Sequence, residues 1–439
     1  MTVGPDNPTS TEDPSGTPAS VATTTGPVGG GFEGDSRTTT TLGDVARDYV
    51  TRVRSGDMGS LPAMLGLVVL VVIFSIASDT FTTKLNIANL ITQAAPISVL
   101  AMGLVIVLLL GEIDLSAGVA GSTGATITAL LIVDHGQGWV VAAVAGLGIG
   151  AVIGLAIGLL VARLGIPSFV VTLAFFLGLQ GVMLKVIGEG GSVRFADEFL
   201  RGLAIKNLSP TAGWVLAVVV IAAYTLLTVR RYQVQVARGL QRPPFGLVVF
   251  RIVALSVVLV GLVAFMNVDR SRNPNFPIQG VPRMLVVVMA LLIFWTFILN
   301  RTRYGRHLYA VGGNAEAARR AGINVLRVRV SAFMICSTMA VISGLLLAAN
   351  TGKVSPGSGA GNTLLYAVGA AVIGGTSLFG GKGRAVDAVI GGVVIATVSN
   401  GLLLLNNASW INFIVTGGVL LLAASVDAIS RRRRSAAGV

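Results

Sequence analysis

Long runs without a charged residue alternate along the chain with short polar segments. A membrane-spanning helix needs about 20 predominantly apolar residues, with a range of roughly 17–25. The last run, 39 residues long, is interrupted by Asn406-Asn407-Ala408-Ser409 and has room for two spans. The pattern predicts an all-α integral membrane protein with about twelve transmembrane helices. The runs are Leu61–Ser78, Leu85–Gly111, Leu115–Val133, Gly136–Ala162, Leu164–Leu184, Asn207–Val229, Ile252–Val268, Met284–Asn300, Val330–Gly352, Val354–Gly381 and Ala388–Val426.

Composition supports this interpretation. Of the 439 residues, 53% are hydrophobic and only 12% are charged. A soluble domain keeps about a quarter of its residues charged, so the apolar residues here are expected to face lipid. The net charge of +13 is interpreted as basic loops on the cytoplasmic side of a membrane, and no nucleic-acid partner is expected.

The basic residues set the predicted orientation of the spans. With the N-terminus inside, the inner segments hold 22 lysines and arginines and the outer segments hold nine. Because cytoplasmic loops carry an excess of Lys and Arg, both termini are predicted to be cytoplasmic. We expect a disordered polar tail at 1–42, a basic juxtamembrane segment at 43–60, a transmembrane domain at 61–428 with an inner loop at 300–329, and a basic tail at 429–439.

Glycines interrupt the apolar pattern in two of the runs. Gly374-Gly375 and Gly380-Gly381 break one of them, and Gly165-Ile166-Pro167 opens another. Non-helical backbone at membrane depth is tolerated only inside protein or beside a water-filled path. Both segments are therefore predicted to be broken or re-entrant and to face the interior, where they could line a route. A separate stripe of glycines predicts close packing of helices within one subunit: Gly146, Gly150, Gly154 and Gly158.

Polar side chains within the runs are almost all uncharged. Ion and proton relays use charged groups inside the membrane, whereas Glu112, Asp114 and Asp387 fall at the ends of runs. Neutral hydrogen-bonding groups suit a neutral polyhydroxyl solute, although for any single residue a hydrogen bond between helices is the commoner role. The candidates for a solute path are Asn89, Gln93, Thr172, Gln180 and Asn400.

The stretch GGNAEAARRAGINVLR, which starts at Gly312, predicts a short polar helix in the inner loop. Asn314 is suited to cap its N-terminus, and Glu316 lies in the first turn, where the helix dipole favours an acid. Glu316 and Arg320 can pair, and Gly322 can end the helix in a left-handed turn after about eight residues.

A helix of this length is marginal in water and needs support from a contact. Small alanines offer a flat surface for close docking, so Ala317 and Ala318 are predicted to lie against a cytoplasmic partner. The alternative, a helix lying on the membrane surface, is disfavoured because the helix has no large apolar face.

Three stretches carry a family resemblance. GGNAEAARRAGI resembles the loop that permease subunits of ATP-binding-cassette (ABC) importers insert into their ATPase subunits. GEIDLSAG, at 111–118, resembles the GGIDLSVG of the ribose/xylose branch of these sugar permeases, with Glu112 in place of the usual glycine. The stretch GAAVIGGTSLFGGKGRAVDAVIGG, at 369–392, is similar to the same branch. The resemblance is strongest to the D-xylose type.

The resemblance implies roles for particular residues. Contact with the ATPase falls to six of them: Gly313, Asn314, Glu316, Ala317, Ala318 and Gly322. Structural roles fall to eight more: Gly111, Asp114, Ser116, Gly118, Gly374, Gly375, Gly380 and Gly381. Asp114 and Ser116 are expected to hydrogen-bond the free backbone groups of a helix end at the inner side of the membrane.

The same resemblance implies partners. The chain has no phosphate loop of the form G-x-x-x-x-G-K-[ST], so ATP and magnesium are expected on a separate ATPase subunit and no cofactor on this chain. Two permease copies, two cytoplasmic ATPases and an extracytoplasmic sugar-binding protein would work together in a bacterial plasma membrane.

Two other classes of protein remain as alternatives. An ion-coupled secondary transporter usually has two similar halves and intramembrane charges, and neither is visible here. A membrane-embedded enzyme would need carboxylates, histidines or cysteines clustered near one face. Glu112 and Asp114 are the only close acidic pair near the membrane, and His135 and His307 lie far apart, so no catalytic residue and no metal site is expected.

Overall fold

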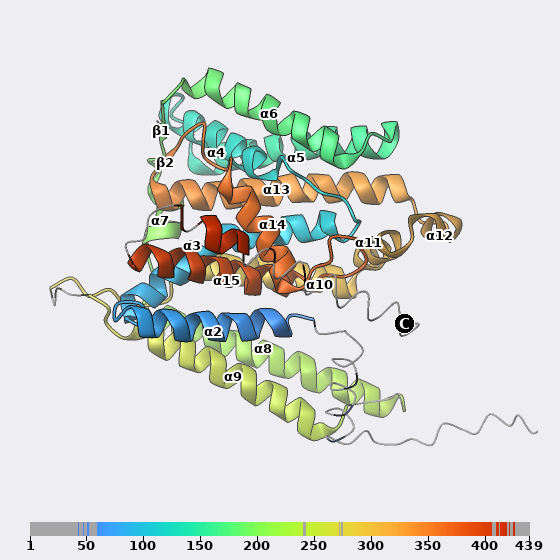
Figure 1. The fold of residues 1–439 in the computed structure, drawn as a ribbon. Helices are drawn as coiled ribbons and strands as arrows, with labels where there is room; N and C mark the ends of the chain where they lie inside the picture. Colours follow the sequence, from blue (N-terminus) through green and yellow to red (C-terminus); the bar gives the residue numbers. More distant parts are fainter. Residues whose placement is uncertain are drawn as a thin grey trace, which may run out of the picture.

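The computed structural model describes residues 59–405 apart from 240–242, 272 and 274, with scattered positions within 43–51 and 410–425. Most of its long helices run in roughly one direction (Figure 1). The tails expected at 1–42 and 429–439, and the polar break at 406–409, lie outside the described residues. The elements are α2 Leu61–Ala77, α3 Lys84–Leu108, α4 Ala117–Val133, α5 Trp139–Leu164, α6 Ser168–Ile187, β1 Val193–Arg194, α7 Glu198–Ile205, α8 Pro210–Ala237, α9 Phe245–Asn267, α10 Arg283–Arg301, α11 Arg303–Gly313, α12 Ala315–Arg320, α13 Val325–Thr351, β2 Lys353–Val354, α14 Asn362–Gly374 and α15 Ala385–Leu404.

Eight of the described helices are long and apolar enough to cross a membrane: α3, α5, α6, α8, α9, α10, α13 and α15. The apolar helices α2, α4 and α14 are shorter, with 17, 17 and 13 residues. The described part is therefore an all-helical membrane protein with fewer full-length spans than the twelve expected. Three of the expected spans are the shorter helices α2, α4 and α14, the last of which already ends before Gly375, and the run expected after 406–409 is described only at scattered positions.

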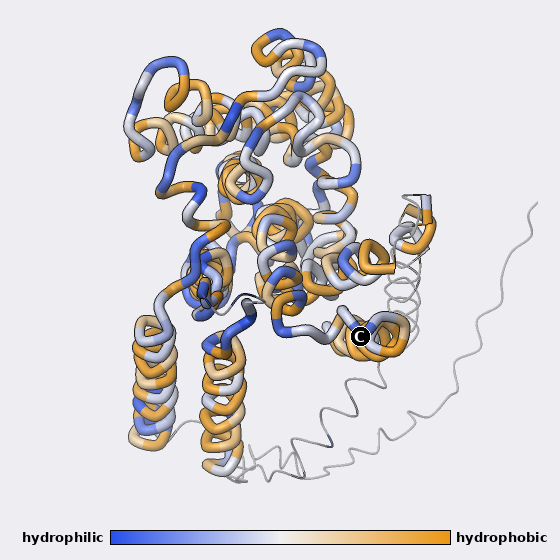
Figure 2. Tube along the Cα trace, turned by 90° about the vertical axis from the view of Figure 1, so that its left-hand side faces the viewer, coloured by the Kyte–Doolittle hydropathy of each residue, from blue (hydrophilic) through white to orange (hydrophobic). Residues whose placement is uncertain are grey.

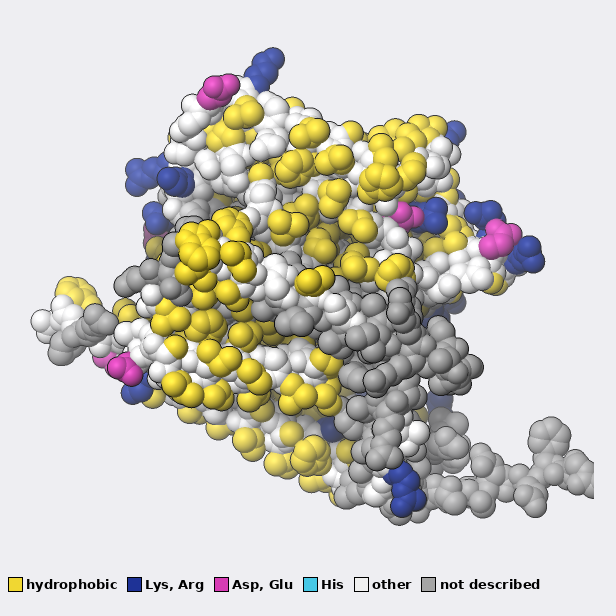
Figure 3. Space-filling view, viewed as in Figure 1, with side chains coloured by type: hydrophobic (Ala, Val, Ile, Leu, Met, Phe, Trp, Pro, Cys, Tyr) yellow, Lys and Arg dark blue, Asp and Glu magenta, His cyan; other side chains and the backbone are white. Residues whose placement is uncertain are grey.

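The surface has the distribution of side chains that a membrane requires. Figure 3 shows hydrophobic side chains across the middle of one face, whereas most of the visible Lys, Arg, Asp and Glu side chains lie toward its two ends. Lipid offers no hydrogen-bond partners, so the backbone polar groups of such a band must be satisfied within helices. The helices therefore lie with their ends, rather than their sides, toward water.

The ends of the helices follow local sequence signals. Thr83 accepts a hydrogen bond from the backbone N–H of Asn86 at the start of α3, and Ser209 does the same for Ala212 at the start of α8. Gly165 and Gly352 adopt left-handed backbone angles, with φ of 72° and 75°, and end α5 and α13. Ser and Thr commonly cap the free N–H groups at the start of a helix, and glycine commonly ends a helix in a left-handed turn.

The core is formed by α3, α13 and α15, with α4, α5 and α14 packed against them. In α3, 72% of the most apolar 18-residue stretch is buried, and in α13 and α15 the share is 67%. Three glycines of the α5 stripe face α13: a Cβ atom at Gly150 would lie 2.9 Å from the carbonyl oxygen of Ser337, and one at Gly158 would lie 2.8 Å from Val330 Cα. The fourth, Gly146, packs on Gly124 of α4. Packing within one subunit is therefore confirmed for this stripe.

Two regions lie at the periphery of the chain. Only 11% of the corresponding stretch is buried in α8 and in α9, which pack mainly against each other. They form two mostly hydrophobic columns below the main body in Figure 2.

The prediction of a broken, inward-facing run at Gly165-Ile166-Pro167 was wrong, because these residues form the turn before α6. Helix α6 is continuous, and only 17% of its most apolar stretch is buried.

The two ends of the bundle carry different small elements (Figure 1). At one end, β1 and β2 pair antiparallel, with Val193 opposite Val354 and Arg194 opposite Lys353, and α7 lies beside them. At the other end lie α11 and α12. The chain thus separates a short two-stranded ribbon from a polar helical loop by the full length of its core helices.

Candidate functional site

Helix α12 has the cap that its sequence indicates. Asn314 adopts an extended backbone, and its side-chain Oδ1 accepts a hydrogen bond of 2.9 Å from the backbone N–H of Ala317. Gly322 has φ of 83°, and the next N–H, that of Ile323, donates to the carbonyl of Ala318 at 3.0 Å. The helix has six residues rather than the expected eight, because this closing turn already begins at Ala321.

Fewer alanines of α12 are exposed than its sequence indicates. Glu316 is exposed and pairs with Arg320 at 3.3 Å, as predicted, and also with Arg319 at 3.2 Å. Ala317 is exposed as well, whereas Ala318 is buried against its own chain with only 5% of its surface exposed. The expectation that both alanines present a docking surface is therefore corrected. Glu316 and Ala317 are the exposed positions, while Ala318 packs against the rest of the chain.

The GEIDLSAG segment forms the turn between α3 and α4. Asp114 is fully buried, and its Oδ1 accepts hydrogen bonds from the backbone N–H of Ser116 at 2.9 Å and from the Ser116 hydroxyl at 2.6 Å. These bonds satisfy groups at the start of α4 that have no partner within the helix. Glu112, where the resemblance leads one to expect glycine, lies 3.5 Å from the Arg329 guanidinium at the start of α13. Gly111, with φ of 73°, supplies the left-handed backbone at the turn, and Gly118 of α4 packs directly on Gly359.

The segment between α14 and α15 is non-helical, as its glycines indicate. Gly375, Gly380 and Gly381 all have positive φ, and the backbone N–H of Gly381 donates to the carbonyl of Leu109 at 2.8 Å. Gly374 ends α14 directly against the backbone of Asp387, where no Cβ would fit. The segment thus returns to the end of the bundle that carries α11 and α12.

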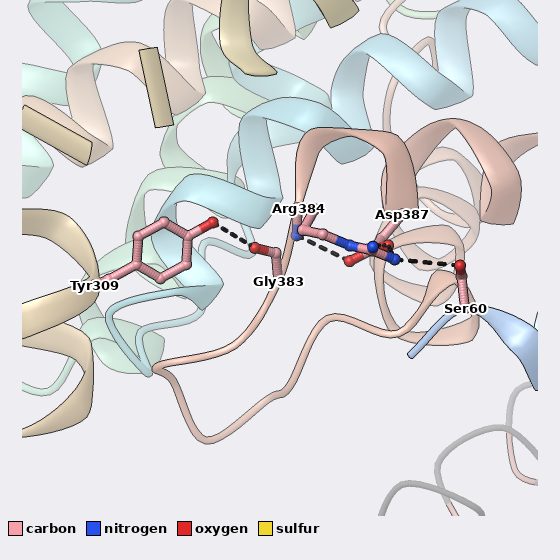
Figure 4. Close-up of polar contacts among 5 residues, drawn as sticks. All are labelled: Ser60, Tyr309, Gly383, Arg384 and Asp387. Atoms are coloured by element: carbon pink, nitrogen blue, oxygen red, sulfur yellow. Dashed lines mark hydrogen bonds and ion pairs between the residues drawn. The ribbon is translucent and has the colours of Figure 1, made fainter. Parts of the chain in front are cut away.

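A polar network follows directly after these glycines (Figure 4). The Arg384 backbone N–H donates to the Asp387 carboxylate at 2.8 Å, and its guanidinium pairs with the same carboxylate at 2.7 Å. The guanidinium also donates to the Ser60 hydroxyl at 3.2 Å, beside the start of α2. The Tyr309 hydroxyl, on α11, donates to the Gly383 carbonyl at 2.7 Å. Sequence reasoning missed this network, and only the Arg384–Asp387 spacing at the start of a helix could have indicated part of it.

Two of the five candidates for a solute path meet in space. The Asn400 side chain donates to Asn86 at 3.0 Å and to Gln93 at 3.3 Å, and the Asn86 amide donates back at 2.8 Å. We name Asn86, Gln93 and Asn400 the amide cluster. It joins α3 to α15, and Asn86 is the member that sequence reasoning missed.

The remaining three candidates are not members of the amide cluster, although Asn89 lies within one helical turn of Asn86 and Gln93 on α3. Asn89 is exposed, Gln180 is partly buried on the peripheral helix α6, and the Thr172 hydroxyl donates to the carbonyl of Ser168 in its own helix at 2.8 Å. No group of three or more His, Cys, Asp or Glu side chains that could hold a metal ion occurs in the part of the chain that the structure describes. The described polar candidates thus hydrogen-bond between helices, as in the amide cluster, or within their own helix, as at Thr172.

These features together define a class of protein. An apolar helical bundle with a small amide cluster between core helices and a capped polar helix at one end has the arrangement of a transport permease. The chain belongs to the family described as the permease component of branched-chain amino acid transport systems, whose family model matches residues 86–424. Family membership makes the chain a membrane transport subunit rather than an enzyme.

Individual relatives are similar over most of their length. The xylose transport system permease protein of Escherichia coli strain K12 is 33% identical over 372 residues, which cover 84% of this chain and 91% of the relative. The corresponding protein of Haemophilus influenzae is 32% identical, with coverage of 84% and 96%. The ribose import permease protein of Escherichia coli strain K12 is 29% identical, with coverage of 87% and 96%. No solved structure matches the chain.

Proposed function

We propose that this chain is the membrane permease of an ABC importer, and that the imported solute is a xylose-like monosaccharide. Family membership and the relatives of xylose and ribose systems support the transport class and the solute class. ATP and magnesium would be bound by a separate ATPase subunit, since the chain has no phosphate loop. The protein would work in a bacterial plasma membrane with about twelve crossings and both termini in the cytoplasm.

The geometry of α12 is the observation that carries this proposal. A short, capped helix at the end of the bundle presents Ala317 and Glu316 to the surroundings while Ala318 fixes it to the core. Exposed ion pairs contribute little stability, so Glu316, Arg319 and Arg320 are better explained by a partner than by folding. We assign that partner as the ATPase, in a complex of two permeases and two ATPases.

The opposite end of the bundle supports a place for the binding protein. Arg194 and Lys353 face each other across the β1–β2 ribbon, both are exposed, and neither forms an ion pair with another described residue. Like charges directly opposite each other destabilise a strand pair. An acidic surface on a sugar-binding protein would relieve this repulsion, so we place its docking face here.

The solute path is proposed to pass beside the amide cluster. Gln93 is only partly buried and is bonded to Asn400 on one side, which leaves amide hydrogen-bonding capacity for a hydroxyl group. A neutral sugar needs such neutral donors and acceptors. The charged groups Asp114 and Asp387 are instead engaged at the starts of α4 and α15.

Ala317→Glu tests the role of α12. The change keeps helix propensity high and adds volume and charge to a close contact. A misfit of this kind costs about 1–3 kcal/mol, which is roughly a 5- to 150-fold loss in an association constant. Tagged ATPase should therefore recover much less of the variant permease from membranes, and sugar uptake should fall with it, while the permease still inserts.

Ala237→Glu is the matched control, because Ala237 is exposed at the end of α8, away from α12. It should leave recovery by the ATPase unchanged. Equal recovery of wild-type and Ala317→Glu permease, at equal membrane levels, would contradict the proposed docking role. Glu316→Ala should act in the same direction as Ala317→Glu but more weakly, because it removes charge without adding volume.

A further inference from the structure

Three backbone segments meet near the end of α11. The N–H of Gly381 donates to the carbonyl of Leu109 at 2.8 Å, which joins the α14–α15 segment to the end of α3. A Cβ atom placed on Gly312 would overlap that same Leu109 carbonyl oxygen and would lie 3.1 Å from the Gly381 nitrogen. Gly380 also lies close to this point, since its Cβ would lie 2.9 Å from the Gly312 carbonyl oxygen. We name Leu109, Gly312, Gly380 and Gly381 the glycine junction.

The glycine at position 312 is explained by space alone. It lies within helix α11 and is not among the glycines with a left-handed backbone angle. In a helix, alanine is more favourable than glycine, so a helical glycine needs a separate reason. The direct contact with Leu109 supplies that reason, since a methyl group would force α11 away from α3. Gly313, the next residue, has open space around it.

A second contact ties α11 to the same segment. The Tyr309 hydroxyl donates to the Gly383 carbonyl at 2.7 Å, and the next residue, Arg384, caps α15 through Asp387 (Figure 4). Burial, with the Asp387 carboxylate nearby, raises the pKa of Tyr309, so the hydroxyl keeps the proton that it donates. Helix α11 therefore contacts the α14–α15 segment on both sides of Lys382.

The position of the glycine junction relates two distant features. On one side, only Asn314 separates α11 from α12, so the two helices cannot move independently over a long distance. On the other side, the junction contacts the end of α3 and the segment leading into α15, and these two helices carry the amide cluster toward their other ends. A displacement of α12 would therefore reach both helices of the amide cluster through backbone contacts.

We infer that the glycine junction and the Tyr309–Gly383 hydrogen bond form the link through which an ATPase bound at α12 moves α3 and α15. The inference rests on the proposed function. Gly312 and Tyr309 are positioning residues, because neither needs to touch solute or ATP. Close backbone contacts transmit displacement well, since well-packed interiors have low compressibility and few voids to absorb it.

Gly312→Ala tests the link in the complete complex. Permease, ATPase and binding protein are reconstituted in liposomes, and sugar uptake, ATP hydrolysis and recovery of ATPase with tagged permease are measured on the same preparation. Overpacking of the junction should reduce sugar transported per ATP about tenfold. ATP hydrolysis and ATPase recovery should persist, because the exposed face of α12 is unchanged. Gly148→Ala, on α5 with no atom near its Cβ, is the matched control and should keep the wild-type ratio.

Tyr309→Phe provides a second, gentler variant. It removes only the hydrogen bond to Gly383 and should lower sugar transported per ATP by roughly two- to tenfold. If Gly312→Ala fails to insert into the membrane, this variant decides alone. A wild-type ratio of transport to hydrolysis in either inserted variant would overturn the inference. So would loss of ATPase recovery, which would make the junction a support for docking only. Failure of the wild-type permease to recover any ATPase would instead refute the proposed function.

Discussion

Helix α13 and the pair α8–α9 are similarly free of charge over their central turns, yet they occupy opposite environments. About two thirds of the most apolar stretch of α13 is buried, compared with about one ninth in α8 and α9. The side chains of Phe250 and Val257 on α9 are each 66% exposed. Apolar character therefore does not distinguish a core helix from a peripheral helix in this protein.

The difference lies in small and hydrogen-bonding residues. In α13 the buried positions include Ser337, Ser343 and Ala340, and the Ser343 hydroxyl donates to the Pro96 carbonyl of α3 at 2.6 Å. In α8 only Gly213 and Ala217 are buried. Lipid tails are as apolar as leucine, so helices associate through close packing and hydrogen bonds rather than through a hydrophobic driving force. Small and hydroxyl-bearing residues therefore belong to the core only where a facing helix contacts them, as between α13 and α3; most of the Gly, Ala and Thr residues of α8 are not buried.

The strongest test of this contrast introduces the same side chain into both regions. Gly154 of α5 faces α13, and a Cβ atom there would lie 2.7 Å from the carbonyl carbon of Phe333. Gly154→Leu should separate the two helices and cost about 3 kcal/mol or more, at the upper end of overpacking effects. We expect little correctly folded permease in size-exclusion chromatography of detergent-solubilised membranes, and no uptake.

Gly261→Leu is the counterpart in α9, where a Cβ atom would have no described neighbour within 4 Å. It should yield normal amounts of folded protein. Equal yields for the Gly154 and Gly261 variants would break the contrast between core and periphery.

Sequence alone predicted the features that depend on local chemistry. The cap at Asn314, the left-handed turn at Gly322 and the end of α14 at Gly374-Gly375 all follow from the properties of one or two residues. The intrasubunit packing of the glycine stripe was also predictable, because a bare helical face requires a close neighbour. Its partners, α13 and α4, were not.

Features that depend on distant pairs could not be predicted. Ser60 and Arg384 are 324 residues apart in the chain, and Asn86 and Asn400 are 314 apart. The burial of Ala318 likewise depends on how α12 rests on the bundle, and alanine favours a helix in either orientation. The turn at Gly165-Ile166-Pro167 was misplaced because glycine and proline mark a break between helices as readily as a break within one.

A smaller effect on stability is expected from substitutions in the amide cluster. They compare a buried and an exposed asparagine of the same helix, Asn86 and Asn89 of α3. Asn400→Ala leaves the buried Asn86 amide without its reciprocal partner, at a cost of about 1–2 kcal/mol. Thermal unfolding of the purified permease should occur at lower temperature, and uptake should fall. Asn89→Ala, at an exposed position on α3, should change the free energy of unfolding by less than about 0.5 kcal/mol. A larger loss for Asn89→Ala would place the hydrogen-bonded core elsewhere.

The smallest effect on stability is expected for substitutions on the exposed side of α9. They test whether this side contacts lipid or a second permease. Phe250 and Val257 are seven residues apart, so they lie on one side of the helix. If that side faces lipid, replacing both with alanine exchanges one apolar contact for another. The free energy of unfolding should then change by about 0.5 kcal/mol or less, and uptake should remain normal. Native mass spectrometry of the assembled complex should still find two permeases. Dissociation of the two copies in the double variant would instead place α9 at the interface between them, and the low burial of α8–α9 in a single chain would then reflect a missing neighbour rather than lipid.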